Sequence, residues 1–560
     1  MSDRPWLRHY DEGVPHSLAP YPSITILDLL KDHARDIPGD EAFLFMGASL
    51  SWRELEFKSN AFASALQAQG VGKGDRVALL MPNSPQMIIA EFGIWKVGGI
   101  AVPLNPLYTE SELERSLCDS GAETAIALTP FYAKLNSIRS KTTLKRVITT
   151  SIKEYLPLPK RLLFKLLKER RGGHRIVLQP GDLMMKGMID SYAFSESPDV
   201  TVRPEDPALF LFSGGTTGHP KCVIGRHEAF IMTGMQVNTW FRSALGDERI
   251  AVMLNLPLFH VYAQVAVMGG GFLRRSPMVL MPDPRDTGAL IATIKRLKVQ
   301  MLPGVPTLFN ALAAHPRLKR DPNALRSLRL IISGASSLHQ DTRKRFEELT
   351  GGSIIEAYSL TEAMVSPVFA PASGRLKPGA VGLPAPDVEL RIVDAEEANI
   401  PLSTGEIGEI LIRSPQIMTG YWGNPEETDL VLRNGWVHTG DLGYLDEDGY
   451  LFVVDRKKDL IKASGFQIWP REVEEVIAAH PAVLETGVAG VPDIHQGEAV
   501  KAWIVLREGR SLDYAELKSW CRKELAAYKV PKHIEFRDTL PKSAVGKVLR
   551  RVLVEEHKAG

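Results

Sequence analysis

Residues 212–221 read Phe-Ser-Gly-Gly-Thr-Thr-Gly-His-Pro-Lys and follow an apolar run, Ala208–Leu211, that predicts a β-strand. The glycines let the main chain bend tightly, so that several backbone N–H groups can turn toward one anion. Hydroxyl groups and one ammonium accompany them, and together these donors suit a polyphosphate. The candidate ligands are Ser213, Gly214, Gly215, Thr216, Thr217, Gly218 and Lys221. The spacing is not that of a Walker A loop, and a glycine-rich turn without a ligand is the alternative.

Apolar runs of strand length alternate with amphipathic helical stretches on both sides of this loop. The predicted elements are Arg76–Met81 (strand), Ser84–Val97 (helix), Gly99–Val102 (strand), Ser111–Ser120 (helix), Ile291–Leu297 (helix), Gln300–Leu302 (strand), Leu328–Ile332 (strand) and Gln340–Thr350 (helix). Such alternation predicts α/β layers with a largely parallel sheet.

The last third of the chain has a different pattern. Short strands and turns in Glu406–Val454 predict a small antiparallel unit. A charged segment, residues 455–459, then precedes a stretch that is long enough for a small α+β domain. Its predicted elements are Pro470–Ala479 (helix), Val483–Val491 (strand), Ala499–Leu506 (strand), Tyr514–Leu525 (helix) and His533–Phe536 (strand). We therefore predict an N-terminal domain at 1–455 and a C-terminal domain at 456–560.

Composition excludes several classes of protein. The 560 residues carry 67 Lys and Arg against 66 Asp and Glu, and this balance argues against a chain-wide electrostatic binder of nucleic acid. The 3 cysteines are far apart and suggest neither a disulfide framework nor a zinc site, which fits a reducing compartment. The N-terminus lacks an apolar signal-peptide core. The longest apolar region, Leu254–Leu273, is interrupted by polar residues and glycines, so we expect buried strand and helix there.

Residues 160–175 form one strongly basic stretch. Seven of these residues are Lys or Arg, the one acid is Glu169, and leucines are interleaved with the basic residues. A surface helix with a solvated face is one interpretation. A basic, amphipathic anchor at a membrane surface is the other.

A second candidate site is the stretch Glu356–Glu362. Here Tyr358 could stack on a purine, Thr361 could reach a phosphate, and Glu362 is a hard oxygen ligand suited to Mg²⁺. These side chains follow a predicted strand, Ser353–Glu356, where a purely structural role is equally common.

Further candidates are single residues. Asp441 stands between Gly440 and Leu442-Gly443, and a carboxylate on such a turn can accept hydrogen bonds from two ribose hydroxyls; a structural turn residue is the alternative. Lys547 lies in a Pro-Lys-x-x-x-Gly-Lys frame near the C-terminus, where a lone lysine is normally solvated. His260 follows an apolar segment at a predicted strand end, where a core histidine is the usual reading, and Trp240 is read as a core tryptophan.

The chain resembles the adenylate-forming superfamily of acyl-CoA synthetases, luciferases and adenylation domains, and in particular its long-chain fatty acid–CoA ligases. Ser-Gly-Gly-Thr-Thr-Gly-x-Pro-Lys resembles the phosphate loop of that family, Tyr-x-x-Thr-Glu its second element, and Ser333-Gly334-Ala335-Ser336 the loop that borders adenine and the acyl site. The resemblance runs from Trp6-Leu7-Arg8 to the last residues. Two departures are Cys222 and Ser359, where the family usually has glycine.

The resemblance implies a role for each candidate. Lys547 would act at the carboxylate and α-phosphate, Glu362 and Thr217 would hold Mg²⁺, and His260 would position the acid. Trp240 is a weaker candidate for the gate of the acyl tunnel, as the alternative to a core tryptophan. Ribose would lie at Asp441 and Arg456, adenine near Gly334 and Ala335, and the pantetheine path at Ser464 and Gly465. Lys458 matches the family's hinge position, about which the small domain rotates between two half-reactions.

The expected activity is ligation of a carboxylic acid, a medium- to long-chain fatty acid, to coenzyme A through an acyl-adenylate, with ATP and Mg²⁺. Rival readings are an acyl-AMP ligase that loads a carrier protein, an aryl-acid ligase, and a non-catalytic nucleotide-binding or membrane-interaction protein. We expect no nucleic-acid partner and a cytoplasmic location, with peripheral membrane association through residues 160–175 and a homodimer both left open.

Overall fold

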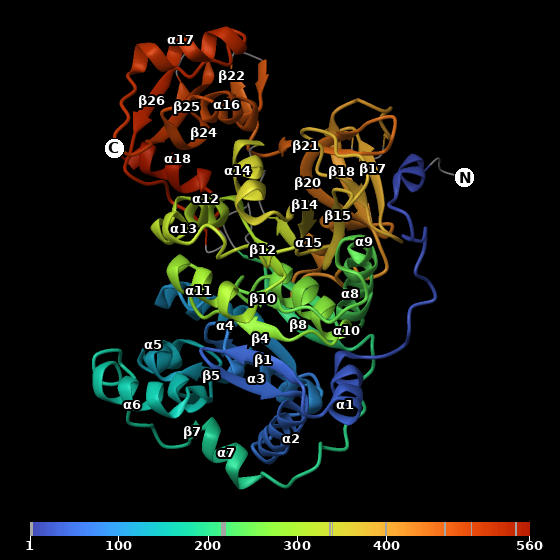
Figure 1. Ribbon diagram of the computed structural model, residues 1–560, viewed down its shortest axis with the longest axis vertical. Coiled ribbons are helices and arrows are strands. Elements are labelled where there is room, and N and C mark those ends of the chain that lie inside the picture. Colours follow the sequence, from blue (N-terminus) through green and yellow to red (C-terminus); the bar gives the residue numbers. More distant parts are fainter. Residues whose placement is uncertain are drawn as a thin grey trace.

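The computed structural model describes residues 4–213, 220–334, 338, 340–397, 400–463, 466–493, 496–543 and 546–559. These residues form four β-sheets with helices packed around them. The C-terminal part stands at the top of the molecule, apart from the larger body that the rest of the chain builds (Figure 1). The α/β class that the alternation predicts is confirmed.

The first sheet carries the glycine-rich loop. Its strand order is β7 (Leu183–Met184), β6 (Arg146–Thr150), β5 (Thr124–Leu128), β3 (Arg76–Leu80), β4 (Ile100–Pro103), β8 (Pro207–Phe212) and β9 (Cys222–Arg226). All neighbours pair in parallel except β8 and β9, which run antiparallel on either side of the loop. The loop therefore leaves the sheet at the carboxyl end of β8, where ligands of α/β sheets usually bind.

The second sheet carries the Tyr-x-x-Thr-Glu stretch. Its order is β16 (Leu383–Pro384), β15 (Val365–Phe369), β14 (Ser353–Leu360), β13 (Leu330–Ser333), β12 (Met301–Gly304), β10 (Val252–Leu254), β11 (Met278–Leu280), β1 (Glu41–Phe45) and β2 (Ala48–Ser51). Its middle is parallel, and its two ends are antiparallel. Parallel strands are usually buried on both faces, so helices are expected to cover the parallel parts of both sheets.

Helix α3 (Pro85–Lys96) shows how the body is held together. Every residue of α3 is buried, and its sequence is apolar on almost all sides, which is typical of a helix enclosed between layers. Helices α2 (Trp52–Ala68) and α8 (Glu228–Trp240) pack in the same apolar core as the strands of both sheets. Trp240 lies in this core with its Nε1 donating to the Ala370 carbonyl at 3.1 Å, so the core reading of Trp240 is confirmed.

The third sheet is antiparallel and consists of β17 (Glu389–Val393), β18 (Gly408–Arg413), β20 (Trp436–Leu445), β19 (Leu432–Arg433) and β21 (Leu451–Arg456). It begins earlier than the predicted unit, because β17 lies before residue 406. It stands beside the C-terminal part at the upper right of Figure 1.

The chain leaves β21 through residues 457–459 and enters the fourth sheet. This sheet consists of β23 (Phe466–Ile468), β22 (Ile461–Ala463), β25 (Gly497–Leu506), β24 (Val483–Asp493) and β26 (His533–Phe536), with helices α16 (Pro470–Ala478), α17 (Tyr514–Glu524) and α18 (Arg550–Ala559). Its buried side chains form apolar clusters of their own, separate from the core of the body. A separate core is what an independently moving domain needs.

Some expectations are wrong in detail. Strand β14 continues to Leu360, so Tyr358 lies within a strand and not after it. His260 does not end a strand, since β10 stops at Leu254 and His260 immediately precedes a helical segment whose π-helical turn spans Tyr262–Val267. The helix of the basic stretch, α6, covers only Leu158–Leu167. Among the described residues, no helix is both long and apolar enough to cross a bilayer.

Candidate active site

Tyr421 connects the lysine of the glycine-rich loop to the candidate metal ligand. Its hydroxyl donates to Glu362 Oε1 at 2.9 Å, and the Lys221 ammonium lies 5.2 Å from the centre of its ring. Lys221 also forms an ion pair with Glu427 at the start of α15 (Pro425–Val431). Burial and then the Glu362 charge raise the pKa of Tyr421, so the phenol stays protonated and keeps donating. Lys221 and Glu362, which are far apart in sequence, therefore share one neighbour.

Glu362 is held on an unusual turn. It follows β14, and its carbonyl accepts from the Met418 N–H at 2.9 Å. The next residues, Met364, Val365 and Ser366, have φ values of 46°, 78° and 39°, which are left-handed and cost side chains of this size about 1–3 kcal/mol each. Buried hydrogen bonds oppose that cost, among them Thr233 Oγ1 to the Met364 carbonyl at 3.1 Å.

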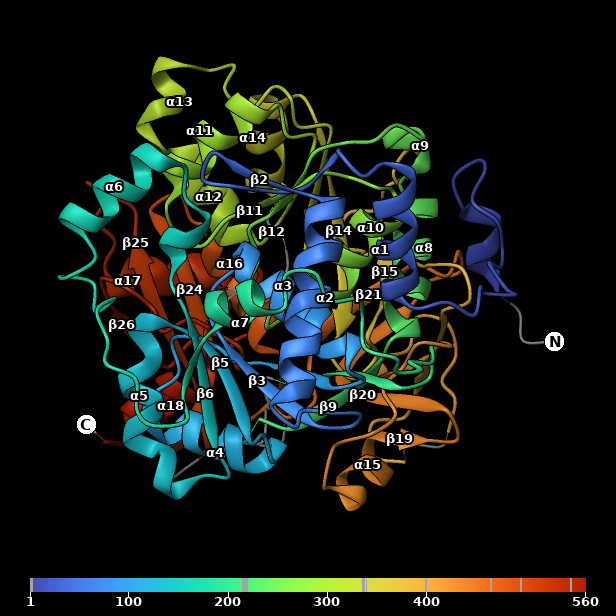
Figure 2. The same ribbon diagram turned by 90° about the horizontal axis from the view of Figure 1, so that it is seen from below.

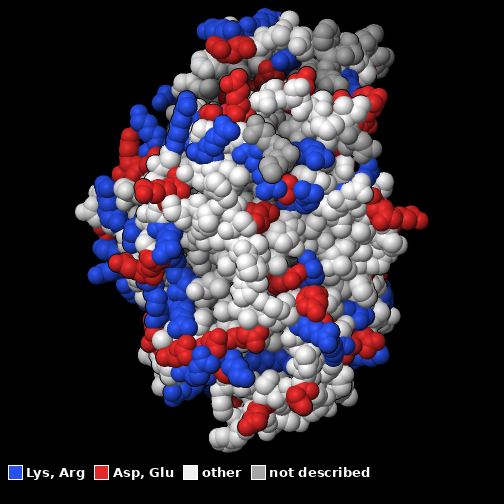
Figure 3. Space-filling view, turned by 90° about the vertical axis from the view of Figure 1, so that its right-hand side faces the viewer, with Lys and Arg blue, Asp and Glu red and all other residues white. Residues whose placement is uncertain are grey.

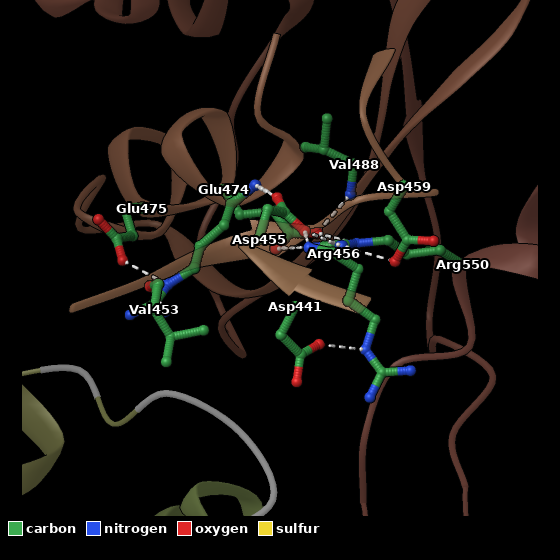
Figure 4. A network of polar contacts seen from close by, with 10 residues as sticks. Asp441, Val453, Asp455, Arg456, Asp459, Glu474, Glu475, Val488 and Arg550 are labelled. Atoms are coloured by element: carbon green, nitrogen blue, oxygen red, sulfur yellow. Dashed lines mark hydrogen bonds and ion pairs between the residues drawn. The ribbon is translucent and has the colours of Figure 1, made fainter. Parts of the chain in front are cut away.

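Tyr358, Asp441 and Arg456 form a second polar group. The Tyr358 hydroxyl donates to Asp441 Oδ2 at 2.8 Å. Arg456 Nε lies 3.0 Å from Asp441 Oδ1, as Figure 4 shows. The register of β20 and β21 places Asp441 directly opposite Arg456. Burial and the Asp441 charge raise the pKa of Tyr358. A half-buried phenol ring with a carboxylate and a guanidinium beside it suits a nucleoside, which offers a base to stack on and hydroxyls to bind.

The terminal lysine, Lys547, reaches this second group. The protein around its ammonium, followed by the Arg456 charge, lowers the pKa of Lys547 to about 8, while Asp441 and Asp459 act in the opposite direction. Lys547 nevertheless retains solvent-exposed surface, so the ammonium is surrounded by protein and still accessible to a ligand. Glu362 in turn raises the pKa of Arg456, so Arg456 lies within electrostatic range of both Glu362 and Lys547.

The loop that carries Lys547 is packed against the body. Gly546 has φ +76°, and a Cβ at this position would come 2.4 Å from Thr307 Oγ1 and 3.5 Å from Val305 Cγ2. Thr307 lies at the start of α12 (Pro306–Ala314), which follows β12 of the second sheet. The close approach requires glycine at position 546, both for its backbone conformation and for space.

Arg550 joins α18 to the segment between the two parts of the chain (Figure 4). It forms ion pairs with Asp455 of β21 at 2.9 Å, with Asp459 of the following turn at 3.1 Å and with Glu474 of α16 at 2.7 Å. Burial alone would lower the pKa of Arg550, but the Glu474 and Asp455 charges outweigh it and raise the pKa. The segment that joins the body to the C-terminal part is thus held by charge-assisted bonds on both sides.

His260 is a buried, unpaired hydrogen-bonding group. Among the described residues its Nε2 has no hydrogen-bond partner, and burial lowers its pKa to about 4. The ring is therefore neutral near pH 7, and it can donate or accept one hydrogen bond. A buried polar atom without a partner points to a missing ligand, because such an atom would otherwise be costly.

The remaining candidates are placed only in part. Gly334 follows β13, and a Cβ there would lie 3.0 Å from the Tyr262 ring, so a larger side chain would push against it. Thr361 lies on the turn beside Glu362. The pKa of Lys458 is lowered, mainly by burial. Ser213 is buried at the end of β8. Outside the described residues lie Gly214, Gly215, Thr216, Thr217, Gly218, Ala335, Ser464 and Gly465.

The side chains present fit a magnesium site that is completed by phosphates. No group of three or more His, Cys, Asp or Glu able to hold a metal occurs in the described part of the chain. Mg²⁺ is usually bound by one or two carboxylates together with substrate phosphates and water. Glu362, oriented by Tyr421, is a suitable carboxylate for that arrangement.

Sequence reasoning missed three residues that the structure brings into this site: Tyr421, Glu427 and Arg550. A signal was present for Glu427, because Asn424 and Pro425 predict the start of a helix, and the Asn424 side chain does cap α15. The glycines that flank Tyr421-Trp422 were a weaker signal. Nothing in the sequence distinguishes Arg550 from its neighbour Arg551.

Comparison with known proteins defines the class. The model of the AMP-binding enzyme family matches residues 30–422, and that of the AMP-binding enzyme C-terminal domain matches residues 472–547. The chain belongs to the family of AMP-binding enzymes.

Its relatives narrow the activity. The chain is 39% identical to the long-chain-fatty-acid–CoA ligase of Bacillus subtilis (strain 168), over 99% of this chain and 98% of that protein. It is 34% identical to the feruloyl-CoA synthase of an Amycolatopsis species, over 92% and 96%. The ATP-bound structure of MatB from Rhodopseudomonas palustris matches with a TM-score of 0.82 and the apo structure with 0.71, each 28% identical over 96% of this chain and 99% of MatB. The protein is thus an acid–CoA ligase that uses ATP, Mg²⁺ and CoA.

Proposed function

We propose that the protein is a long-chain fatty acid–CoA ligase that works in two half-reactions. In the first, a carboxylate oxygen of the acid attacks the α-phosphorus of ATP, and pyrophosphate leaves. In the second, the CoA thiolate attacks the acyl carbon, and AMP leaves. The observation that carries this proposal is the packing of Gly546 against Thr307 of the body, because it holds the loop of Lys547 within electrostatic range of Asp441 and Arg456.

We assign the residue roles on the same basis. Lys547 stabilises the charge that gathers on the α-phosphate oxygens during attack, together with Lys221 and the loop before it. Asp441 and Arg456 hold the ribose, and Tyr358 and Gly334 border the base. Glu362 would hold Mg²⁺, whose charge offsets that of the phosphates when it is bound. His260, neutral and with a free nitrogen, positions the carboxylate of the acid.

We propose that the structure represents the orientation of the first half-reaction. Two observations support this: the loop of Lys547 packs against α12 through Gly546, and the chain matches ATP-bound MatB more closely than apo MatB. The second half-reaction needs Lys547 to leave, so the domain at 456–560 rotates about the hinge at 455–459, with Lys458 as its pivot. Rotation would bring in the segment with Ser464 and Gly465, which we assign to the pantetheine path.

The relatives point to two classes of acid. The Bacillus relative supports a long-chain fatty acid, whereas the Amycolatopsis relative favours an aryl acid as the second candidate. ATP and CoA as substrates favour action in the cytoplasm, and an acid that partitions into lipid favours action at the cytoplasmic face of a membrane.

A substrate screen tests the proposal. Purified protein is mixed with ATP, Mg²⁺ and acids from short to long chain and aromatic acids, with and without CoA, and pyrophosphate release is followed. Multiple turnover that requires CoA and is fastest with long-chain acids is the expected result. Faster turnover with aromatic acids would replace the fatty-acid assignment, and turnover that requires a carrier protein in place of CoA would identify a carrier-loading enzyme.

A further inference from the structure

Helix α6 exposes an apolar face that the proposed catalytic chemistry does not use. The solvent-exposed fraction of its leucines is 69% for Leu158, 61% for Leu162, 57% for Leu163, 81% for Leu166 and 60% for Leu167. Positions 162, 163, 166 and 167 recur at spacings of three and four residues, which places them on one side of a helix. Such a run of large exposed side chains on one helix marks an interaction surface.

The helix is fixed to the body by its opposite side. Phe164 is the one half-buried residue of α6, and its ring packs edge-on against His174 with the centroids 4.8 Å apart. Lys160 donates to the Met46 carbonyl, and Arg161 donates to the Glu154 carbonyl at 3.0 Å. Because these contacts fix the other face of α6 to the body, the leucines point outward. In both ribbon views α6 lies at the edge of the molecule (Figures 1 and 2).

Positive charge flanks the leucines and is not neutralised by nearby acids. Glu169, the acid within this stretch, is already paired with Lys153. In the portion of the chain that the structure describes, Lys165, Lys168, Arg170 and Arg171 form no ion pair with a carboxylate. On the opposite face of the molecule, by contrast, basic and acidic side chains are interspersed (Figure 3).

We propose that α6 and the turn after it dock onto the surface of an anionic lipid bilayer, with the leucines in the acyl boundary and the basic side chains among the headgroups. Helices that combine an outward apolar stripe with flanking Lys and Arg lie in the plane of such interfaces. The proposal deepens the proposed function, since a membrane would supply the acid, but the binding itself needs no substrate.

The test uses the full-length protein and sedimentation with vesicles, without ATP, acid or CoA. One set of vesicles is phosphatidylcholine, and the other contains about 30% phosphatidylglycerol, which gives a negative surface. We expect binding to the anionic vesicles to be at least about tenfold tighter and to weaken at high salt. Leu162→Ser with Leu166→Ser should weaken it at least about tenfold, and Lys165→Gln with Lys168→Gln and Arg171→Gln should reduce it to the level of phosphatidylcholine.

A matched control is Leu376→Ser with Leu484→Ser, which alters leucines exposed by 50% and 45% elsewhere on the surface. This variant should bind as the unaltered protein does, and all variants should keep CoA-dependent turnover of a water-soluble acid. Failure of the wild-type protein to bind anionic vesicles, or binding that the α6 leucines do not affect, would overturn the proposal. So would self-association without lipid that the α6 variant abolishes, because a second copy would then be the occupant.

Discussion

Gly546 of the C-terminal loop lies against Thr307 of α12 so closely that a single added carbon would come 2.4 Å from the threonine hydroxyl. This contact joins the loop of Lys547 to the body at a point distinct from the group formed by Tyr358, Asp441 and Arg456. It therefore offers a way to disfavour one orientation of the C-terminal domain without changing any charge in the site.

Gly546→Ala should slow acyl-adenylate formation and spare the thioester step. Overpacking costs about 1–3 kcal/mol, which lowers the population of the docked orientation and the first rate about 5- to 150-fold. Single-turnover formation of acyl-AMP and CoA-dependent consumption of supplied acyl-AMP measure the two steps separately. Gly509→Ala is the matched control, because Gly509 also has a positive φ, +72°, but has nothing within 4 Å of its added Cβ.

Thr307→Ala should partly restore the first step in the Gly546→Ala background, since it removes the hydroxyl that the new Cβ meets. The coupling between the two changes, read from a double-mutant cycle, measures the contact itself. Additive effects would show that the two residues do not meet in the reacting enzyme.

Arg550→Ala should destabilise the junction between the two domains. Asp455 is 3% exposed and Glu474 19%, so removal of the guanidinium leaves carboxylates that are poorly hydrated, at a cost of roughly 3 kcal/mol. Thermal unfolding and limited proteolysis near residues 455–459 report this loss. Arg551→Ala is the control, because Arg551 is 60% exposed and pairs only with Glu555 among the residues described. An exposed ion pair of this kind contributes less than about 0.5 kcal/mol to stability. Equal stability of the two variants would refute the role of Arg550.

The first half-reaction should lose rate above pH 8. The pKa of Lys547 in the free protein is about 8, and only the ammonium form, present below that pH, can stabilise phosphate charge. Thus kcat/KM for ATP, which reflects the free enzyme, should fall as pH rises through about 8. Lys547→Arg should lack that fall, because a guanidinium stays charged. The same fall in both proteins would assign the titration to another group.

Tyr421→Phe should weaken activation by Mg²⁺ about tenfold, since ligands that lose an orienting hydrogen bond typically lose 10- to 100-fold in affinity. The variant keeps the ring beneath Lys221 and removes only the bond to Glu362. A Mg²⁺ titration of pyrophosphate release measures the effect. Trp422→Phe, a change in the next residue, whose ring packs on Phe210 at 5.0 Å, should leave the titration unaltered.

Local pattern was enough to predict much of the fold. The bounds of α14 (Gln340–Thr350) and β26 agree with the sequence reading, because amphipathic periodicity and strand propensity act over short distances. His260 was misplaced for a related reason: residues 255–259 are mostly apolar and few, so periodicity could not separate a strand from the loop that leads into a helix.

Prediction of the site needs information on long-range pairing and packing that local sequence pattern does not contain. Asp441 and Arg456 meet because the pairing of β20 with β21 shifts its register between Leu442 and Gly443, and local pattern does not reveal such a shift. The approach of Lys547 to Arg456 depends on how two separate cores are docked. Motif resemblance pointed to Lys547 and to Arg456, but only the fold brings the two within electrostatic range of each other.

The most direct measurement is the effect of Lys547→Ala on each half-reaction taken alone. Loss of one preorganised charge in a transition state costs about 100- to 1000-fold, so acyl-AMP formation from ATP and acid should fall by that factor. Conversion of supplied acyl-AMP to acyl-CoA should stay within about threefold of the unaltered enzyme, because Lys547 has left the site by then. An equal loss in both half-reactions would contradict a terminal lysine that serves the first step alone.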